Sequence, residues 1–224
     1  MALLHYHPPM TPYLRILYKD EYLLVLEKPS GLLSVPGIKF KDSLQNRAQR
    51  VFPTATVVHR LDMATSGIML MPLQKQTHRD LSSQFQQRLI KKRYLARVHG
   101  IPDDESGEIN LPLIVDWENK PKQKVDYEHG KKSQTFWQIL GKKENESLIE
   151  LKPITGRSHQ LRVHMLSLGH PILGDRLYAH PEALSMASRL QLHAAEISFE
   201  HPDTKELMHF KSRCPFAEDY INEG

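Results

Sequence analysis

Short apolar runs separated by tight turns recur along most of this chain. Two of them flank the polar turn Lys19-Asp20-Glu21, and two more flank the turn at 141–146. Strands joined by short turns pair antiparallel, whereas parallel strands need longer crossovers. The sequence therefore predicts an α+β fold with a mixed, mainly antiparallel sheet flanked by short helices. The predicted strands are 14–18, 22–27, 57–58, 68–71, 92–100, 133–140, 147–152, 190–199 and 208–212.

Fewer segments have the spacing of a helix. Leu81, Phe85 and Leu89 recur every four residues, which places them on one helical face. Ser158 is suited to cap the start of another helix, and Gly169 to follow its end in a left-handed conformation. The predicted helices are 43–52, 75–89, 158–169 and 181–187.

Composition limits the class of protein. Hydrophobic residues are 40% and charged residues 25% of the 224-residue chain, as expected for a globular protein. The length suits one large domain, or two lobes that share a core. No apolar run has the length of a membrane span, and the first residues lack the pattern of a signal peptide. The single cysteine, Cys214, excludes an internal disulfide framework and fits the cytoplasm. We therefore expect a cytoplasmic protein without membrane association.

Positive charge is modest in total but clustered. The net charge is +4 and the isoelectric point about 9.0. Lysines and arginines gather at 91–93, 120–124, 131–132 and 142–143. Such clusters suit contacts with the phosphates of a nucleic acid, although solvated loops also contain them.

A polar bend at 59–67 is the candidate functional site. Asp62 lies at the bend between the strands expected at 57–58 and 68–71, and Arg60 precedes it by two positions. A catalytic carboxylate in a partly dry pocket needs a cation beside it to stay ionised. Arg162, one turn into the helix predicted at 158–169, is a candidate for that cation. A purely structural ion pair between Asp62 and Arg162 is the alternative.

Other candidate residues are aromatic or imidazole groups. Tyr94 follows a basic cluster, so it could stack on an unpaired base, or it could be buried in the sheet. His159 and His164 are five residues apart, with no cysteine or carboxylate to complete a metal site. We expect no metal, and Cys214 is expected to be unreactive.

Four motifs, in order, carry a resemblance to a known family. They are Lys28-Pro29-Ser30-Gly31, the segment 59–67, the segment 92–100, and the segment 156–164 with 169–175. On these motifs the chain resembles the RluA family of RNA pseudouridine synthases over roughly residues 12–216. The arrangement expected from this resemblance is an N-terminal arm at 1–11, a single catalytic domain of the pseudouridine synthase fold with two lobes at 12–216, and a tail at 217–224.

The resemblance also implies site residues. Asp62 matches the catalytic aspartate, Arg162 the arginine that pairs with it, and Tyr94 the aromatic that stacks on the target base. Arg60 would fill the gap left by the flipped nucleotide, and Leu192 would form an apolar wall. The further residues expected to bind RNA or the base are His59, Thr65 and Lys28.

The implied substrates are a uridine in 23S rRNA and a uridine in the anticodon stem-loop of tRNAs, without a cofactor or metal. A monomer with no obligate protein partner is expected. Two other classes of protein are alternatives. A non-catalytic RNA-binding protein is disfavoured by the intact set of site residues, and a nucleosidase usually needs two carboxylates where the bend offers one.

Overall fold

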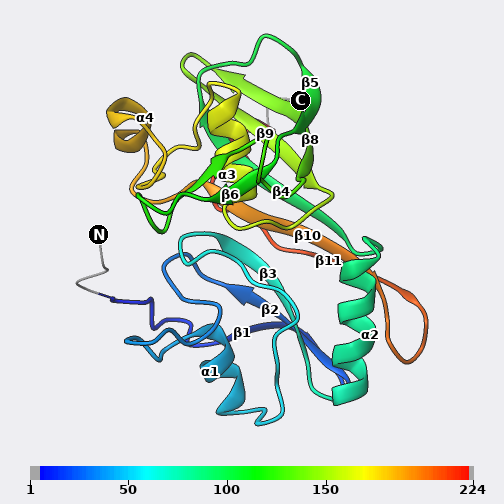
Figure 1. Ribbon diagram of the computed structural model, residues 1–224. Helices are drawn as coiled ribbons and strands as arrows, with labels where there is room; N and C mark the ends of the chain where they lie inside the picture. The colour runs from blue at the N-terminus through cyan, green and yellow to red at the C-terminus, as the bar shows by residue number, and fades with distance from the viewer. Residues whose placement is uncertain (1–5, 222–224) are drawn as a thin grey trace. The chain divides into compact units, whose positions relative to one another are not determined.

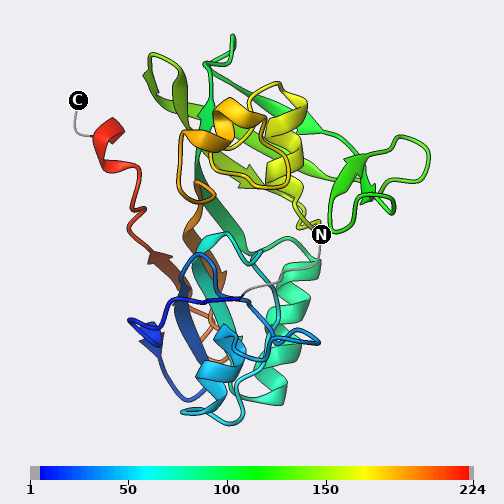
Figure 2. The same cartoon turned by 90° about the vertical axis from the view of Figure 1, so that its left-hand side faces the viewer.

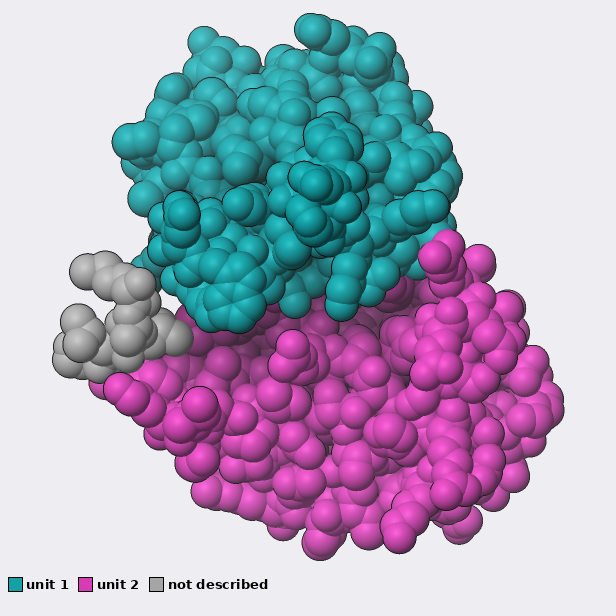
Figure 3. All heavy atoms as spheres, in the orientation of Figure 1, with its two compact units in different colours: residues 1, 93–193, 214–224 teal, residues 2–92, 194–213 magenta. Residues whose placement is uncertain are grey.

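The computed structural model describes residues 6–221, which form two compact units (Figures 1 and 3). Unit 1 contains residues 93–193 together with the chain from 214 onward, and unit 2 contains the chain up to 92 together with 194–213. The chain leaves unit 2 within strand β4 (Lys91–His99) and returns to it within strand β10 (Leu192–Glu200). Each unit is therefore built from segments that are distant in sequence.

Unit 2 contains the first half of the sheet, in the order β1-β2-β3-β10, with β11 paired to β10. The pairs β1–β2, β2–β3 and β10–β11 are antiparallel, which confirms the predicted hairpins and the α+β class. The remaining elements of this unit are β1 (Arg15–Lys19), β2 (Leu23–Lys28), α1 (Leu44–Gln49), β3 (Ser66–Pro72), α2 (Lys75–Gln86) and β11 (Leu207–Lys211).

The core of unit 2 lies between the sheet and α2. Leu81 of α2 is completely buried in the same cluster as Val25 of β2 and Leu70 of β3. The helical prediction for this region is correct for Leu81 and Phe85 but wrong for Leu89, which lies beyond the helix and is 56% exposed. The backbone leaves the helix at Arg88, whose φ of 61° is left-handed.

The strand predicted at 57–58 is wrong, because residues 55–65 form an extended loop. This loop lies along β3 through single contacts instead of a ladder. The amide of Thr56 donates to the carbonyl of Pro72 at 2.9 Å, and the His59 ring accepts from the amide of Leu70 at 2.9 Å. A side-chain acceptor thus replaces a strand carbonyl, which an apolar sequence pattern does not reveal.

Unit 1 contains the second half of the sheet, in the order β4-β9-β8-β5, and a separate hairpin of β6 and β7. The pairings β4–β9, β9–β8, β8–β5 and β6–β7 are antiparallel. Figure 2 shows the green hairpin extending away from the other strands of this unit. The elements are β5 (Ser106–Asn110), β6 (Leu113–Val115), β7 (Gln123–Val125), β8 (Gln134–Lys143), β9 (Glu146–Pro153), α3 (Gln160–Ser167), α4 (Pro181–Ser185) and α5 (Glu218–Ile221).

Helix α3 begins differently from the prediction. Its N-cap is His159, with a left-handed φ of 54°, and not Ser158. Instead of a capping hydroxyl, the Gln160 side chain accepts a hydrogen bond from the amide of Arg157 at 2.9 Å. The predicted end of the helix is confirmed, because Gly169 follows it with a φ of 87°.

The chain ends are bound to the units as far as they are described. From residue 6 onward the predicted arm is anchored, since the Tyr6 hydroxyl donates to the carbonyl of Asp42 at 2.9 Å. In the predicted tail, the Tyr220 hydroxyl donates to Glu146. Residues 1–5 and 222–224 of the expected arm and tail lie outside the described residues.

Candidate active site

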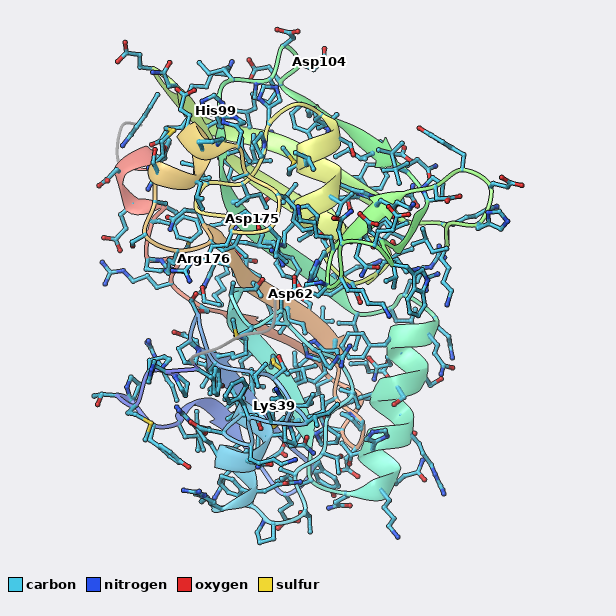
Figure 4. All side chains as sticks on the ribbon, turned by 60° about the vertical axis from the view of Figure 1, so that its left-hand side comes forward. Lys39, Asp62, His99, Asp104, Asp175 and Arg176 are labelled. Atoms are coloured by element: carbon cyan, nitrogen blue, oxygen red, sulfur yellow. The ribbon has the colours of Figure 1, made fainter. Side chains whose placement is uncertain are left out.

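Asp62 lies on a turn that leads directly into β3 (Figure 4). The turn is closed by the amide of Thr65, which donates to the carbonyl of Asp62 at 3.1 Å. Thr65 is buried at 2% exposure, whereas Asp62 is only partly buried. The turn therefore places a carboxylate at the surface of unit 2 while its base is packed.

Lys28 binds the backbone in the middle of this turn. Its ammonium group is completely buried at the end of β2 and donates to the carbonyl of Met63 at 3.0 Å. It also donates to the carbonyls of Leu32 at 2.7 Å and Pro29 at 2.9 Å. A buried cation is stable only when its donors are satisfied, so these carbonyls must stay in place around it. The lysine thus joins the loop after β2 to the loop that carries Asp62.

Two serines extend the contact between these loops on either side of Asp62. The Ser34 hydroxyl donates to the carbonyl of Leu61 at 2.6 Å and accepts from the amide of Leu61 at 3.1 Å. The Ser30 hydroxyl donates to the carbonyl of Ala64 at 2.7 Å. We call residues 28–34 the clamp segment. It fixes the backbone before and after Asp62, which limits the positions that the carboxylate can adopt.

His59 and Arg60 precede the turn and differ in accessibility. The His59 ring packs against Phe85, with centroids 4.8 Å apart and ring planes tilted by 33°. Burial and the nearby charge of Lys92 lower the pKa of His59 to about 3, so the ring is neutral at ordinary pH. Arg60 is exposed, and it makes no ion pair or hydrogen bond to any residue between 6 and 221.

In unit 1, Tyr94 lies on β4 opposite Leu151 of β9 and is partly exposed. The preceding Arg93 donates to Glu150, so its positive charge is already paired. Leu192, at the start of β10, is 3% exposed. Tyr94 is therefore partly accessible, whereas Leu192 is buried.

Arg162 lies in α3 and has a partner that the sequence did not predict. Its guanidinium forms two hydrogen bonds with the Asp175 carboxylate, from Nε to Oδ2 and from Nη2 to Oδ1, each at 2.7 Å. Both side chains are buried, at 5% and 1% exposure. The Arg162 Cζ atom also lies 5.0 Å from the centroid of the Tyr178 ring. Asp175 ends the segment 169–175 of the fourth motif, and that resemblance was the sequence signal for it.

The predicted site residues thus fall into two groups. Lys28, His59, Arg60, Asp62 and Thr65 belong to unit 2, where the first two motifs, at 28–31 and 59–67, meet at one turn. Tyr94, Arg162 and Leu192 belong to unit 1. The pairing of Asp62 with Arg162 stays a prediction, as do the roles in RNA or base binding.

A metal ion or the Cys214 thiol would be the other possible reactive groups. Among residues 6–221, no group of three or more histidine, cysteine, aspartate or glutamate side chains is arranged to hold a metal ion. Burial raises the pKa of the Cys214 thiol to about 11, so it stays protonated at neutral pH. None of the helices in this range is long and apolar enough to cross a bilayer.

Comparison with known proteins gives consistent matches. The family model described as RNA pseudouridylate synthase matches residues 22–167. The dual-specificity RNA pseudouridine synthase RluA of Salmonella typhimurium is 55% identical over 96% of this chain and 100% of its own length. The proteins of the same name from Escherichia coli K12 and Haemophilus influenzae are 53% and 50% identical over the same shares.

Solved structures show the same similarity. Human RNA Pseudouridylate Synthase Domain Containing 1 superposes with a TM-score of 0.80 at 28% identity, covering 94% of this chain and 87% of that one. Human RNA Pseudouridylate Synthase Domain Containing 4 has a TM-score of 0.73 at 25% identity, covering 90% and 89%.

Proposed function

Because the chain belongs to the RNA pseudouridylate synthase family, we propose that it isomerises specific uridines in structured RNA with Asp62 as the catalytic carboxylate. The protein is an RNA pseudouridine synthase, and hence an isomerase. The observation that best supports Asp62 is its turn, which the clamp segment holds from both sides while the side chain stays partly exposed. A group that reacts with a bound nucleotide must be both fixed and accessible.

Uridine and pseudouridine contain the same atoms, so the reaction only rearranges bonds. The C1′–N1 bond of uridine breaks, the uracil rotates, and C5 joins C1′ while the hydrogen of C5 is lost and N1 gains one. A single carboxylate has three possible roles: attack on C1′, attack on the uracil ring, or abstraction of the C2′ proton. In this proposal Arg162 is the cation that pairs with Asp62, Tyr94 stacks on the target base, and Leu192 forms the apolar wall of the pocket.

We further propose two RNA substrates, a uridine in 23S rRNA and a uridine in the anticodon stem-loop of tRNAs. Support comes from relatives named dual-specificity enzymes that are 50–55% identical to this chain along 96% of its length. Loops suit this chemistry, because flipping an unpaired nucleotide costs less than flipping a paired one. Action in the cytoplasm as a monomer is part of the same proposal.

Exposed cations and aromatic rings support RNA binding. Arg60 beside Asp62 is exposed, and it would occupy the space left by the flipped nucleotide. On the hairpin between β6 and β7, the Trp117 ring is 70% exposed and carries the Lys120 ammonium 3.3 Å from its centroid. Such a pair offers a stacking surface for a base and a charge for its phosphate.

The direct test replaces Asp62 with asparagine. The protein is incubated with a tRNA anticodon stem-loop and with 23S rRNA fragments containing [5-³H]uridine. Forming the C5–C1′ bond releases tritium, so the product is measured as tritiated water. We expect Asp62→Asn to lower the rate by roughly 10³-fold or more, with RNA affinity within about threefold of the unaltered protein.

Asp80→Asn is the matched control, because Asp80 accepts a hydrogen bond from Gln76 on α2 and has no role in the proposal. It should leave the rate unchanged. Tritium release by Asp62→Asn at the rate of the unaltered protein would refute the assignment of Asp62. Release of free uracil, with no pseudouridine retained in the RNA, would favour a nucleosidase.

A further inference from the structure

We propose that Asp175 and Tyr178 are positioning residues that fix the guanidinium of Arg162 and connect it to the hairpin of β6 and β7. The inference rests on the proposed function, in which Arg162 serves the reaction. Asp175 and Tyr178 contact neither the substrate nor the reacting atoms in this proposal. It assigns a role to the loop after α3, where Figure 4 labels Asp175.

Asp175 fixes the plane of the guanidinium. Two parallel hydrogen bonds of 2.7 Å, to Nε and Nη2, hold both oxygens of the carboxylate against Arg162. This fork geometry prevents rotation about the last bonds of the side chain, which a single contact would allow. The carboxylate is itself restrained, because Oδ1 accepts the amide of Leu177 at 2.9 Å. Since both side chains are buried, water does not compete for these bonds.

The backbone on either side of Asp175 is equally restrained. Gly174 has a φ of 68°, and a Cβ atom there would lie 2.2 Å from the carbonyl oxygen of Arg189. Only glycine therefore fits at this position. On the other side, the amide of Ala179 donates to the carbonyl of Asp175 at 3.0 Å. The loop thus presents the carboxylate in one orientation and delivers Tyr178 three residues later.

Tyr178 makes contacts at both ends of its side chain. The ring lies 5.0 Å from the Arg162 guanidinium carbon, within the range of a cation–π contact. The hydroxyl accepts the amide of Gln123 in β7 at 2.7 Å and forms a second hydrogen bond of 2.7 Å with Nδ1 of His159, the N-cap of α3. One tyrosine therefore joins the hairpin, the start of α3 and Arg162.

These contacts give the hydroxyl a function that the ring alone does not have. Without it, the ring would lose its hydrogen bonds to β7 and to His159 and would be held less tightly beside the guanidinium, although its edge-to-face contact with the His159 ring, 5.6 Å between centroids, would remain. The hairpin and Arg162 would then no longer be connected through this side chain. We therefore expect removal of the hydroxyl to affect the chemical step more than RNA binding.

The first measurement does not depend on activity. Exchange of the Arg162 Nε proton with solvent is followed by ¹⁵N NMR, with Arg162→Lys used to assign the signal. Tyr178→Phe and Asp175→Asn should each accelerate this exchange by about tenfold or more, because each loosens a contact to the guanidinium. Unchanged exchange in both variants would overturn the proposal.

The second measurement is single-turnover pseudouridine formation. Tyr178→Phe should lower the rate at saturating RNA by about tenfold with RNA affinity within about twofold, and Tyr178→Leu should lower it further. If the tyrosine acts through Arg162, the effect of Tyr178→Phe should disappear in an Arg162→Lys background. Additive effects in the double variant would show a role independent of Arg162 and would also overturn the proposal.

Tyr18→Phe is the matched control, because its hydroxyl donates to Asp20 at 2.9 Å in unit 2. It should alter neither the exchange of the Arg162 proton nor the rate of pseudouridine formation.

Asp62→Asn distinguishes a failure of the proposed function from a failure of the present proposal. If Asp62→Asn remains fully active, the proposed function fails whatever Tyr178 does. If Asp62→Asn is inactive while Tyr178→Phe matches the unaltered protein in rate and exchange, only the present proposal fails.

Discussion

A buried imidazole with two hydroxyl partners, His164, lies on α3, the same helix that carries Arg162. His164 is completely buried, with Nδ1 2.9 Å from the Thr135 hydroxyl and Nε2 2.9 Å from the Ser133 hydroxyl. Burial lowers its pKa to about 4. The neutral ring suits this position, because a proton would add a charge that no carboxylate offsets in these contacts.

This histidine predicts a loss of stability in acid. Above pH 6.5 the ring is neutral in both the folded and unfolded chains, so its contribution is complete. Between pH 6.5 and about 4, the unfolded chain binds a proton that the folded ring does not, and stability falls. The loss attributable to His164 should reach roughly 3 kcal/mol at pH 4. Urea unfolding followed by fluorescence of Trp137, which is buried in the same unit, measures it.

His164→Gln should be less stable at pH 7.5 but should lose less stability between pH 6.5 and 4 than the unaltered protein. Carboxylates contribute to acid unfolding in both proteins, so the difference between their slopes isolates the histidine. The exposed His129, replaced by glutamine, is the control and should leave the slope unchanged. Equal slopes for His164→Gln and the unaltered protein would contradict the prediction.

The sequence predicted the main residues of the candidate site but not the residues that hold them in position. Asp62 stood out because an acid at a polar bend is unusual, and motif resemblance singled out Arg162. Asp175 was not predicted, because a carboxylate 13 residues from an arginine gives no local signal of a bidentate pair. Likewise, the apolar spacing of 158–169 indicated a helix but not that His159 would cap it in a left-handed conformation.

At the scale of elements, Gly67 joins the turn of Asp62 to the sheet. It is a residue of β3 with a φ of 115°, and a Cβ atom there would lie 2.2 Å from the carbonyl oxygen of Ala194 in β10. The neighbouring atoms are backbone, which has little room to move. The turn can therefore approach β10 this closely only with glycine at its end.

Gly67→Ala should consequently destabilise unit 2 by about 3 kcal/mol or more, from backbone strain together with steric overlap. Gly169→Ala separates these causes. Gly169 also has a positive φ, of 87°, but no atom lies within 4 Å of its added Cβ. That variant should lose only about 1–2 kcal/mol from strain. Thermal and urea unfolding measure both, and equal losses would show that the approach to β10 is unimportant.

The sequence predicted elements well where burial alternates regularly and poorly where side chains replace backbone partners. The hairpin of β1 and β2 was evident from two apolar runs around a polar turn. The segment at 57–58 resembled a strand by the same criterion. It is a loop instead, because its neighbours bind it through the His59 ring and the Ser34 hydroxyl. A pattern of apolar residues does not distinguish these two modes of support.

For the whole molecule, alternation and turn lengths predicted an α+β fold with a mainly antiparallel sheet, and the strand pairings confirm it. The composition of the two units was not predictable. Residues 194–213 return to unit 2 after a hundred residues of unit 1. Which distant strands become neighbours depends on long-range packing, which local periodicity does not encode.

The distribution of charge over the molecule leads to a final prediction. The hairpin of β6 and β7 contains three lysines that have no ion-pair partner among the described residues: Lys120, Lys122 and Lys124. A second basic cluster is different. Lys142 forms an ion pair with Glu105, and Lys143 forms one of 3.9 Å with Asp219. Both clusters contribute to the net charge, but only the lysines of the hairpin are available to bind phosphates.

RNA affinity should therefore fall with salt, and the hairpin should account for part of the slope. Each phosphate contact contributes about 0.7 to the slope of log K against log salt for a single strand. Replacing all three hairpin lysines with glutamine should lower the slope by about 2. The double replacement of Lys142 and Lys143 by glutamine is the control and should leave the slope unchanged, because both charges form ion pairs within the protein. Filter binding of the anticodon stem-loop at several salt concentrations measures both, and equal slopes for all three proteins would place the phosphate contacts elsewhere.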